Sequence, residues 1–193
     1  MLDDRCGMSD FYFLRHGATL ANEDGYMCGS EWDLELSEAG KIQAVQGAEI
    51  TQRRVKSLKT ICTSPLLRAR QTANEVWLHF PEADLKEVAE LREWDFGQWS
   101  RAPYKDFKEQ YLSSGNPPGG ETRHVFANRV RAALEKCLSF TRPVLIVAHG
   151  GVWMMIHQAL SLSLIDAPHA VPVHVFQKPG GEWNLRILDM SDR

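Results

Sequence analysis

Two short apolar runs, far apart in the sequence, each end in a histidine. Residues 11–14 are followed by Arg15-His16-Gly17, and residues 144–148 are followed by His149-Gly150-Gly151. Short apolar runs of this kind are typical of buried β-strands. In an open α/β sheet, ligands bind outside the carboxyl ends of the strands. We therefore expect both histidines at one crevice, and Arg15 indicates that its ligand is an anion.

The rest of the chain alternates strand-like and helix-like patterns, which predicts an α/β fold. Strands are expected near residues 10–15, 57–62, 85–90, 143–148 and 172–177, with a further one at 184–188. Helices are expected after Ser37 as N-cap, from Pro65, over 103–114, over 121–140, and from just after His149 to about Leu160. This alternation favours three α/β/α layers with a mostly parallel central sheet.

Length and composition indicate one globular domain. The chain has 193 residues, 44% of them hydrophobic, which fits a single domain over 1–193. The segment Ser113-Ser114-Gly115-Asn116-Pro117-Pro118-Gly119-Gly120 is the strongest loop signal. We expect that an insertion over about 92–122 could form a small lid.

Charge and hydropathy exclude several kinds of partner. The net charge of -3 offers no basic field for nucleic acid or an anionic membrane. The apolar runs are far shorter than the ~20 residues of a membrane helix, and the start, Met1-Leu2-Asp3-Asp4-Arg5, lacks a secretory h-region. We expect a cytoplasmic protein. Its cysteines lack CxxC spacing and are expected as reduced thiols: Cys6, Cys28, Cys62 and Cys137.

Histidine and arginine together favour phosphoryl chemistry. A neutral imidazole is a competent nucleophile near pH 7, so His16 could carry a phosphoryl group. Arg15 offers a planar set of donors for phosphate oxygens, and a second arginine is needed to spread the charge. Arg68 is the best candidate, because it follows a predicted strand within the first turn of a helix, where free N–H groups also favour anions.

Five separated motifs resemble the histidine phosphatase superfamily, the family of phosphoglycerate mutase and many small phosphomonoesterases. Residues 14–22 match R-H-G-x-[ST]-x-x-N, residues 36–44 match L-[ST]-x-x-G-x-x-Q-A, residues 63–73 resemble T-S-x-L-x-R-A-x-Q-T-A, residues 91–99 resemble L-x-E-x-x-[FY]-G-x-W, and residues 147–152 match the closing H-G-G-V motif. The resemblance implies a phosphoglycerate mutase-like fold.

The resemblance also assigns roles to residues. It implies that His16 is the phosphorylated nucleophile, that Arg15, Arg68 and His149 bind the phosphoryl oxygens, and that Glu93 is the proton donor. Chemistry agrees, since an alkoxide leaving group needs a proton and a partly buried carboxylic acid can hold one. Asp95 is a rival acid, but the family pattern favours Glu93. No metal or other cofactor is expected, because the arginines and a histidine supply the charge that Mg²⁺ supplies elsewhere.

Further substrate contacts are expected around this set. The candidates are the Thr19 hydroxyl, Asn22, the Gly150 amide, Cys28 and Gly29 in the loop before Trp32, and Glu121 in the segment Gly119-Gly120-Glu121-Thr122, which resembles G-G-E-[ST]. Glu121 could instead cap the following helix. Trp32 and Trp153 could shape the pocket wall or belong to the core. Five other histidines match no motif and receive no role: His79, His124, His157, His169 and His174.

Three functions are compatible with these residues. The segment between Glu93 and Gly119 is short and balanced in charge, whereas mutases that resemble this chain carry a longer, partly basic insertion there. We therefore expect a phosphomonoesterase that hydrolyses a small organic phosphate ester through phosphohistidine. The alternatives are a cofactor-dependent phosphoglycerate mutase-type phosphotransferase and a regulatory protein that binds a phosphate ligand with little turnover. The sequence does not decide whether the protein forms a homodimer.

Overall fold

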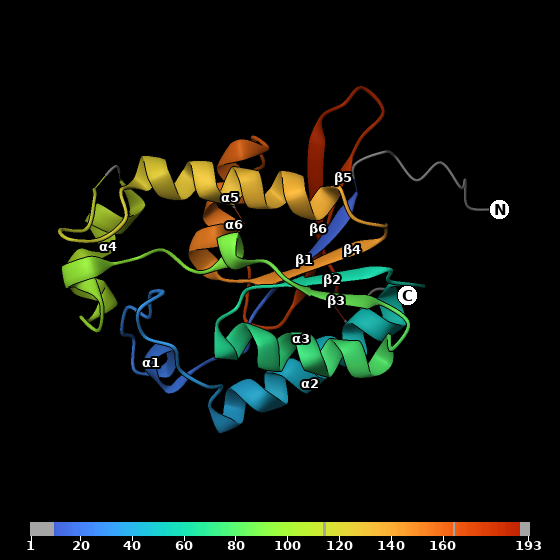
Figure 1. The fold of residues 1–193 in the computed structure, drawn as a ribbon, viewed down its shortest axis with the longest axis horizontal. Helices are drawn as coiled ribbons and strands as arrows, with labels where there is room; N and C mark the ends of the chain where they lie inside the picture. The colour runs from blue at the N-terminus through green and yellow to red at the C-terminus, as the bar shows by residue number, and fades with distance from the viewer. Residues whose placement is uncertain (1–9, 114, 164, 190–193) are drawn as a thin grey trace.

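Six strands form one sheet in the order β3-β2-β4-β1-β5-β6 (Figure 1). The computed structural model describes residues 10–113, 115–163 and 165–189. The strands are β1 (Phe11–Arg15), β2 (Thr60–Thr63), β3 (Asp84–Glu87), β4 (Val144–Ala148), β5 (Pro172–Gln177) and β6 (Trp183–Ile187). Strands β3, β2, β4 and β1 pair in parallel, and β5 runs antiparallel to both of its neighbours. The predicted mostly parallel sheet is confirmed.

Helices cover both faces of the sheet (Figure 1). Helices α2 (Glu38–Arg54) and α3 (Leu67–His79) pack together on one face, and α5 (Arg123–Leu138) and α6 (Gly150–Ala159) on the other. The connections hold α1 (Leu20–Glu23), η1 (Ala89–Leu91), η2 (Gly97–Trp99) and α4 (Tyr104–Leu112). The three predicted layers are confirmed. Sequence reasoning did not find α1, η1 and η2, because elements of three or four residues are too short to show a period.

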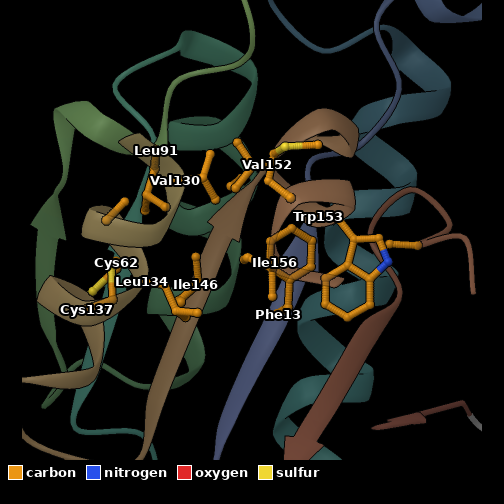
Figure 2. Close-up of a cluster of buried hydrophobic side chains, with 14 of the residues drawn as sticks. Phe13, Cys62, Leu91, Val130, Leu134, Cys137, Ile146, Val152, Trp153 and Ile156 are labelled. Carbon is orange, nitrogen blue, oxygen red and sulfur yellow. The ribbon is translucent and has the colours of Figure 1, made fainter. Parts of the chain in front are cut away.

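Alternate residues of the central strands face the two helical layers. Phe13, Cys62 and Ile146 lie in the core beneath α5 and α6 (Figure 2). The neighbouring residues Leu14, Ile61 and Leu145 lie in a second core beneath α2 and α3. Because both faces are buried, β1 and β4 are apolar almost throughout instead of alternating with polar residues.

Several predicted boundaries shift where the main chain bonds outside the sheet. The strand expected over 57–62 begins at Thr60, because the amide of Lys59 donates to the carbonyl of Pro143 before the ladder starts. The strand expected over 85–90 ends at Glu87 and continues as the short turn η1, which buries Leu91. Ser37 caps α2 as predicted, with its hydroxyl accepting from the amide of Gly40 at 2.9 Å.

The segment over 92–122 lies beside the loop that follows α1. The amide of Met27 donates to the carbonyl of Ala102, and the amide of Tyr104 donates to the carbonyl of Gly25, both at 2.8 Å. These bonds fix the start of α4 next to residues 25–27. That the segment moves as a lid stays a prediction. Within the described ranges, no helix has both the length and the apolar character needed to cross a membrane.

Gly47 sets how closely α2 approaches the segment before β5. A Cβ atom at this position would overlap the carbonyl oxygen of Ala170. Although alanine normally stabilises a helix relative to glycine, we expect Gly47→Ala to lower the free energy of unfolding by about 2 kcal/mol through overpacking. Urea denaturation measures it. Gln46→Ala, exposed on the same helix, is the control and should change stability by less than about 0.5 kcal/mol; equal effects of the two variants would contradict the packing argument.

Candidate active site

The pairing of β1 with β4 brings His16 and His149 together. Arg15 lies opposite Ala148 in the parallel register, and the amide of His16 donates to the carbonyl of Ala148 at 3.0 Å. Each histidine is the next residue after its strand. Their ring centroids are 5.0 Å apart, and both side chains are buried. The two apolar runs therefore deliver their histidines to one site.

Hydrogen bonding fixes which nitrogen of His16 is available. Nδ1 lies 2.7 Å from the carbonyl oxygen of Gly17, so Nδ1 carries the proton and donates it there. Nε2 is left with a lone pair, towards which Nε of Arg68 donates at 3.3 Å. Burial, followed by the positive charge of Arg68, lowers the pKa of His16 well below its ordinary value. His16 is thus a neutral imidazole whose unprotonated Nε2, which accepts from Arg68 in this structure, is the nitrogen that can act as a nucleophile.

Arg68 lies fully buried in the first turn of α3. Its Nη1 donates to the carbonyl of Trp32 at 3.3 Å. Its Nη2 donates to the carbonyls of Cys28 and Gly29 at 3.4 and 3.3 Å. The structure thus places the main chain of Cys28 and Gly29 on Arg68, and Cys28 also lines the cavity described below.

Ser64 orients His149. The hydroxyl of Ser64 accepts from the amide of Leu66 at 3.3 Å and lies 2.7 Å from Nε2 of His149. We assign the Ser64 hydroxyl hydrogen to Nε2, which places the imidazole proton on Nδ1. Burial lowers the pKa of His149 well below its ordinary value, so the ring is neutral. Nδ1 is buried and has no hydrogen-bond partner among the described residues; in the assigned tautomer it is a donor without an acceptor.

Arg15 provides a second donor without an acceptor beside the first turn of α6. Nη1 of Arg15 donates to the carbonyl of Ala167 at 3.3 Å, whereas its buried Nε has no partner in the described part of the chain. Gly150 lies against this guanidinium, since a Cβ there would stand 3.4 Å from Cζ. An arginine beside the free N–H groups of a helix N-terminus suits a phosphate group.

Glu93 holds its carboxyl group at the edge of the same helix terminus. Oε1 accepts from the amide of Trp94 at 2.9 Å, and Oε2 accepts from the amide of Gly151 at 3.0 Å. Glycine is required at 151, because a Cβ would overlap the Glu93 carboxyl. Burial raises the pKa of Glu93, against the opposing effect of these hydrogen bonds and of the two arginines. The group is suited to holding a proton nearer neutral pH than an exposed glutamate.

Glu121 supports Glu93 from outside the cavity. Its carboxylate forms a bidentate pair with Arg129, at 2.9 Å to Nε and 2.6 Å to Nη2, and both side chains are 10% exposed. Arg129 also donates to the carbonyls of Glu90, Arg92 and Glu93. The structure thus places Glu121 in an ion pair that anchors the segment around Glu93. Asp95, the other candidate acid, uses its carboxylate locally and accepts from the amide of Gly97 at 2.8 Å.

Thr19 and Asn22 stabilise the short helix α1. Oδ1 of Asn22 accepts from the amide and the hydroxyl of Thr19, at 3.1 and 3.0 Å. Asn22 also lines the cavity, whereas Thr19 is fully buried.

Trp153 packs on Phe13 with ring centroids 4.7 Å apart and also lines the cavity. The ring of Trp32 lies under Arg101, 5.2 Å from Cζ.

A cavity of about 540 Å³ lies beside this site and is lined by Arg15, Glu93 and Gly150 of the groups described above, whereas His16, Arg68 and His149 are not among its lining residues. Its lining comprises Arg15, Asn22, Gly25, Met27, Cys28, Glu93, Phe96, Tyr104, Tyr111, Leu112, Gly150, Gly151, Trp153, Met154, Ile165, Asp166 and His169. His169 received no role from the sequence, yet its Nδ1 lies 2.7 Å from the carbonyl oxygen of His16. Burial, followed by the charge of Arg15, lowers the pKa of His169 to about 4.

Sequence reasoning missed Ser64 and His169. Ser64 follows β2 directly, as His16 and His149 follow β1 and β4. The same argument about strand ends could therefore have found it. His169 lies in an irregular segment before β5, for which the sequence offers no comparable signal.

No group of three or more potential metal ligands is present among residues 10–113, 115–163 and 165–189. Cys28, Cys62 and Cys137 are free and buried, and Cys6 lies outside the described residues.

Comparison with known proteins gives the family. The family model of the histidine phosphatase superfamily (branch 1) matches residues 11–175. An agropine synthesis reductase from Rhizobium rhizogenes is 36% identical over 93% of this chain, which spans only 42% of that relative.

Shorter relatives match over most of their own length. A glucosyl-3-phosphoglycerate phosphatase from Mycobacterium tuberculosis is 32% identical, with 81% of this chain and 75% of that protein covered. A probable phosphoglycerate mutase from Salmonella choleraesuis is 31% identical, with 74% and 70% covered. The solved structure of a mycobacterial glucosyl-3-phosphoglycerate phosphatase superposes with a TM-score of 0.77 at 27% identity, over 95% of this chain and 99% of that one. The chain belongs to the histidine phosphatase superfamily.

Proposed function

We propose that this protein is a phosphomonoesterase that hydrolyses a small organic phosphate ester through a phosphohistidine intermediate. The observation that supports this proposal most directly is the arrangement of donors around the His16 ring. Its neutral ring presents the Nε2 lone pair beside Arg68, with unpartnered donors on Arg15 and His149 close by. Glu93, an acid with a raised pKa, lines the cavity together with Arg15. Nucleophile, cationic donors and proton donor are thus all present.

In the first step, Nε2 of His16 attacks the phosphorus and the bond to the ester oxygen breaks. The guanidinium groups of Arg15 and Arg68 and Nδ1–H of His149 stabilise the charge on the transferring phosphoryl group. Glu93 gives its proton to the departing ester oxygen, so that a neutral alcohol leaves. The bond of Nδ1 to the Gly17 carbonyl supports the positive charge that develops on the ring.

In the second step, the Glu93 carboxylate takes a proton from water, and the water oxygen attacks the phosphorus. The bond between phosphorus and Nε2 breaks, inorganic phosphate forms, and His16 returns as a neutral ring. The cycle thus restores both residues to their starting states. Because the arginines carry permanent charge, the proposed reaction has no step that calls for a metal ion.

Hydrolysis is favoured over mutase activity by the charges of the cavity. A mutase must retain an intermediate with two phosphate groups, which calls for cations at both ends of the site. Among the described lining residues, Arg15 is the one permanent cation, whereas Glu93 and Asp166 are acidic. The relatives include both a phosphatase and a probable mutase at nearly equal identity, so the choice rests on the cavity. The full set of nucleophile, donors and acid disfavours a binding protein with little turnover.

The proposal extends to the setting of the enzyme. The substrate is a small molecule, and the acidic balance of the chain disfavours nucleic acid and anionic membranes as partners. Three buried free cysteines support a reducing, cytoplasmic location.

Removal of the nucleophile tests the intermediate. We expect His16→Ala to abolish turnover of p-nitrophenyl phosphate and to remove the covalent label that ³²P-labelled substrate leaves on the wild type, a label stable to base and labile to acid. His124→Ala, which changes an exposed histidine, is the control and should keep both. A label or full turnover in the His16 variant would contradict the assignment.

Removal of the Glu93 acid should slow the reaction of different esters to different extents, depending on whether the leaving group needs a proton. For Glu93→Gln, we expect phosphohistidine formation from alkyl esters to slow by about 100-fold or more, and from p-nitrophenyl phosphate far less, because p-nitrophenolate leaves without a proton. Since the variant also lacks the base for water, p-nitrophenolate should appear as a burst followed by slow release. Rapid-quench kinetics measure both phases, with the exposed Glu109→Gln as control. Equal slowing on both substrates would argue against Glu93.

Ser64 should act through His149. Ser64→Ala removes a hydrogen bond to a buried ring, which is worth about 1–3 kcal/mol, so we expect kcat/KM to fall by roughly 5- to 150-fold. The ¹⁵N shifts of His149 should show the proton redistributed between Nδ1 and Nε2. Ser139→Ala, which removes a remote exposed hydroxyl, is the control. Unchanged shifts and unchanged turnover would remove Ser64 from the site.

A further inference from the structure

Two segments enclose the cavity beyond the groups that bind the phosphoryl group. Tyr104, Tyr111 and Leu112 come from α4, and Ile165 and Asp166 come from the connection between α6 and β5. The two tyrosine rings meet edge to face, with centroids 5.6 Å apart. The alcohol part of a bound ester would lie between these two segments.

One acidic side chain, that of Asp166, lines this part of the cavity. Asp166 is exposed, and no ion pair within the described part of the chain engages its carboxylate. Burial and then the charge of Asp166 raise the pKa of Tyr104, and Asp166 also acts on His169. Asp166, Tyr104 and His169 all line this cavity. The proposed mechanism uses Arg15, the one permanent cation among the described lining residues, at the phosphoryl end, so a second acid group on the substrate would meet Asp166 at the other end.

Hydrogen-bond acceptors also predominate there. The Asp166 carboxylate can only accept. His169 is neutral and uses Nδ1–H on the carbonyl of His16, which leaves Nε2 as an acceptor at the cavity. The hydroxyls of Tyr104 and Tyr111 can accept or donate. Hydroxyl groups on a ligand satisfy such a set, and the apolar surfaces of Phe96, Trp153 and Ile165 suit the C–H faces of a polyol or sugar.

We infer that this cavity selects phosphate esters whose alcohol part carries hydroxyl groups and no second acid group, with Asp166 as a specificity-determining residue. The inference rests on the proposed function, since it concerns the alcohol part of the substrate of that same site. It excludes phosphoglycerates, which carry a carboxylate, from the preferred substrates.

A matched pair of esters tests the inference. Glycerol 3-phosphate and 3-phosphoglycerate differ only by a hydroxymethyl group in place of a carboxylate. We expect wild-type kcat/KM to favour glycerol 3-phosphate by at least about tenfold. Asp166→Asn should reduce this preference several-fold by raising kcat/KM for 3-phosphoglycerate. Asp166→Glu should retain it, and so should Asp106→Asn, which removes the same charge from the exposed surface of α4.

Binding measurements separate this inference from the proposed function. Calorimetric Kd values of both esters on His16→Ala give the same ratio without turnover. Tighter binding of glycerol 3-phosphate, with a smaller ratio in the Asp166→Asn, His16→Ala double variant, supports the inference even if the wild type hydrolyses nothing. A wild type that prefers 3-phosphoglycerate, or a ratio that Asp166→Asn leaves unchanged, overturns it. Failure of the wild type to release phosphate from p-nitrophenyl phosphate would instead defeat the proposed function.

Discussion

The parallel pairing of β1 with β4 is the contact on which the site depends. It fixes Arg15 opposite Ala148 and lets the amide of His16 continue the ladder to the Ala148 carbonyl. A slip by one residue would exchange the two faces of the strand, burying the wrong side chains and separating the histidines. The apolar cores on both faces oppose such a slip, because Phe13 and Leu14 each fit only one of them.

Burial shifts the pKa values of His16 and Glu93 in opposite directions, and both shifts favour the neutral form. Loss of water penalises whichever form of a group is charged. It therefore lowers the pKa of His16 and His149 and raises that of Glu93. The resting site thus favours neutral histidines and a carboxyl group that can be protonated, while the arginines keep their charge. One physical cause thus suits His16 and Glu93 to the roles of nucleophile and proton donor that we propose for them.

The sequence contains the parts of the site that depend on strand ends and local motifs. His16 and His149 follow apolar runs, and Ser37 marks the start of α2 through a local cap. Contacts that depend on distances between loops could not be read in this way. The pair of Glu121 with Arg129 joins residues eight apart, but its purpose, anchoring the carbonyls of the Glu93 segment, appears only once α5 is packed beside η1. His169 likewise gains meaning only from the turn that carries it to the main chain of His16.

The main-chain carbonyls around Arg68 have a consequence for the end of the catalytic cycle. They orient the buried guanidinium without neutralising it, as a carboxylate partner would. The full charge remains available to any phosphate dianion, and free phosphate presents the same oxygens as the esterified group. In the proposed cycle, the charge that would bind the phosphate of the substrate would also bind the phosphate product, so a higher affinity for phosphate would mean slower release of the product.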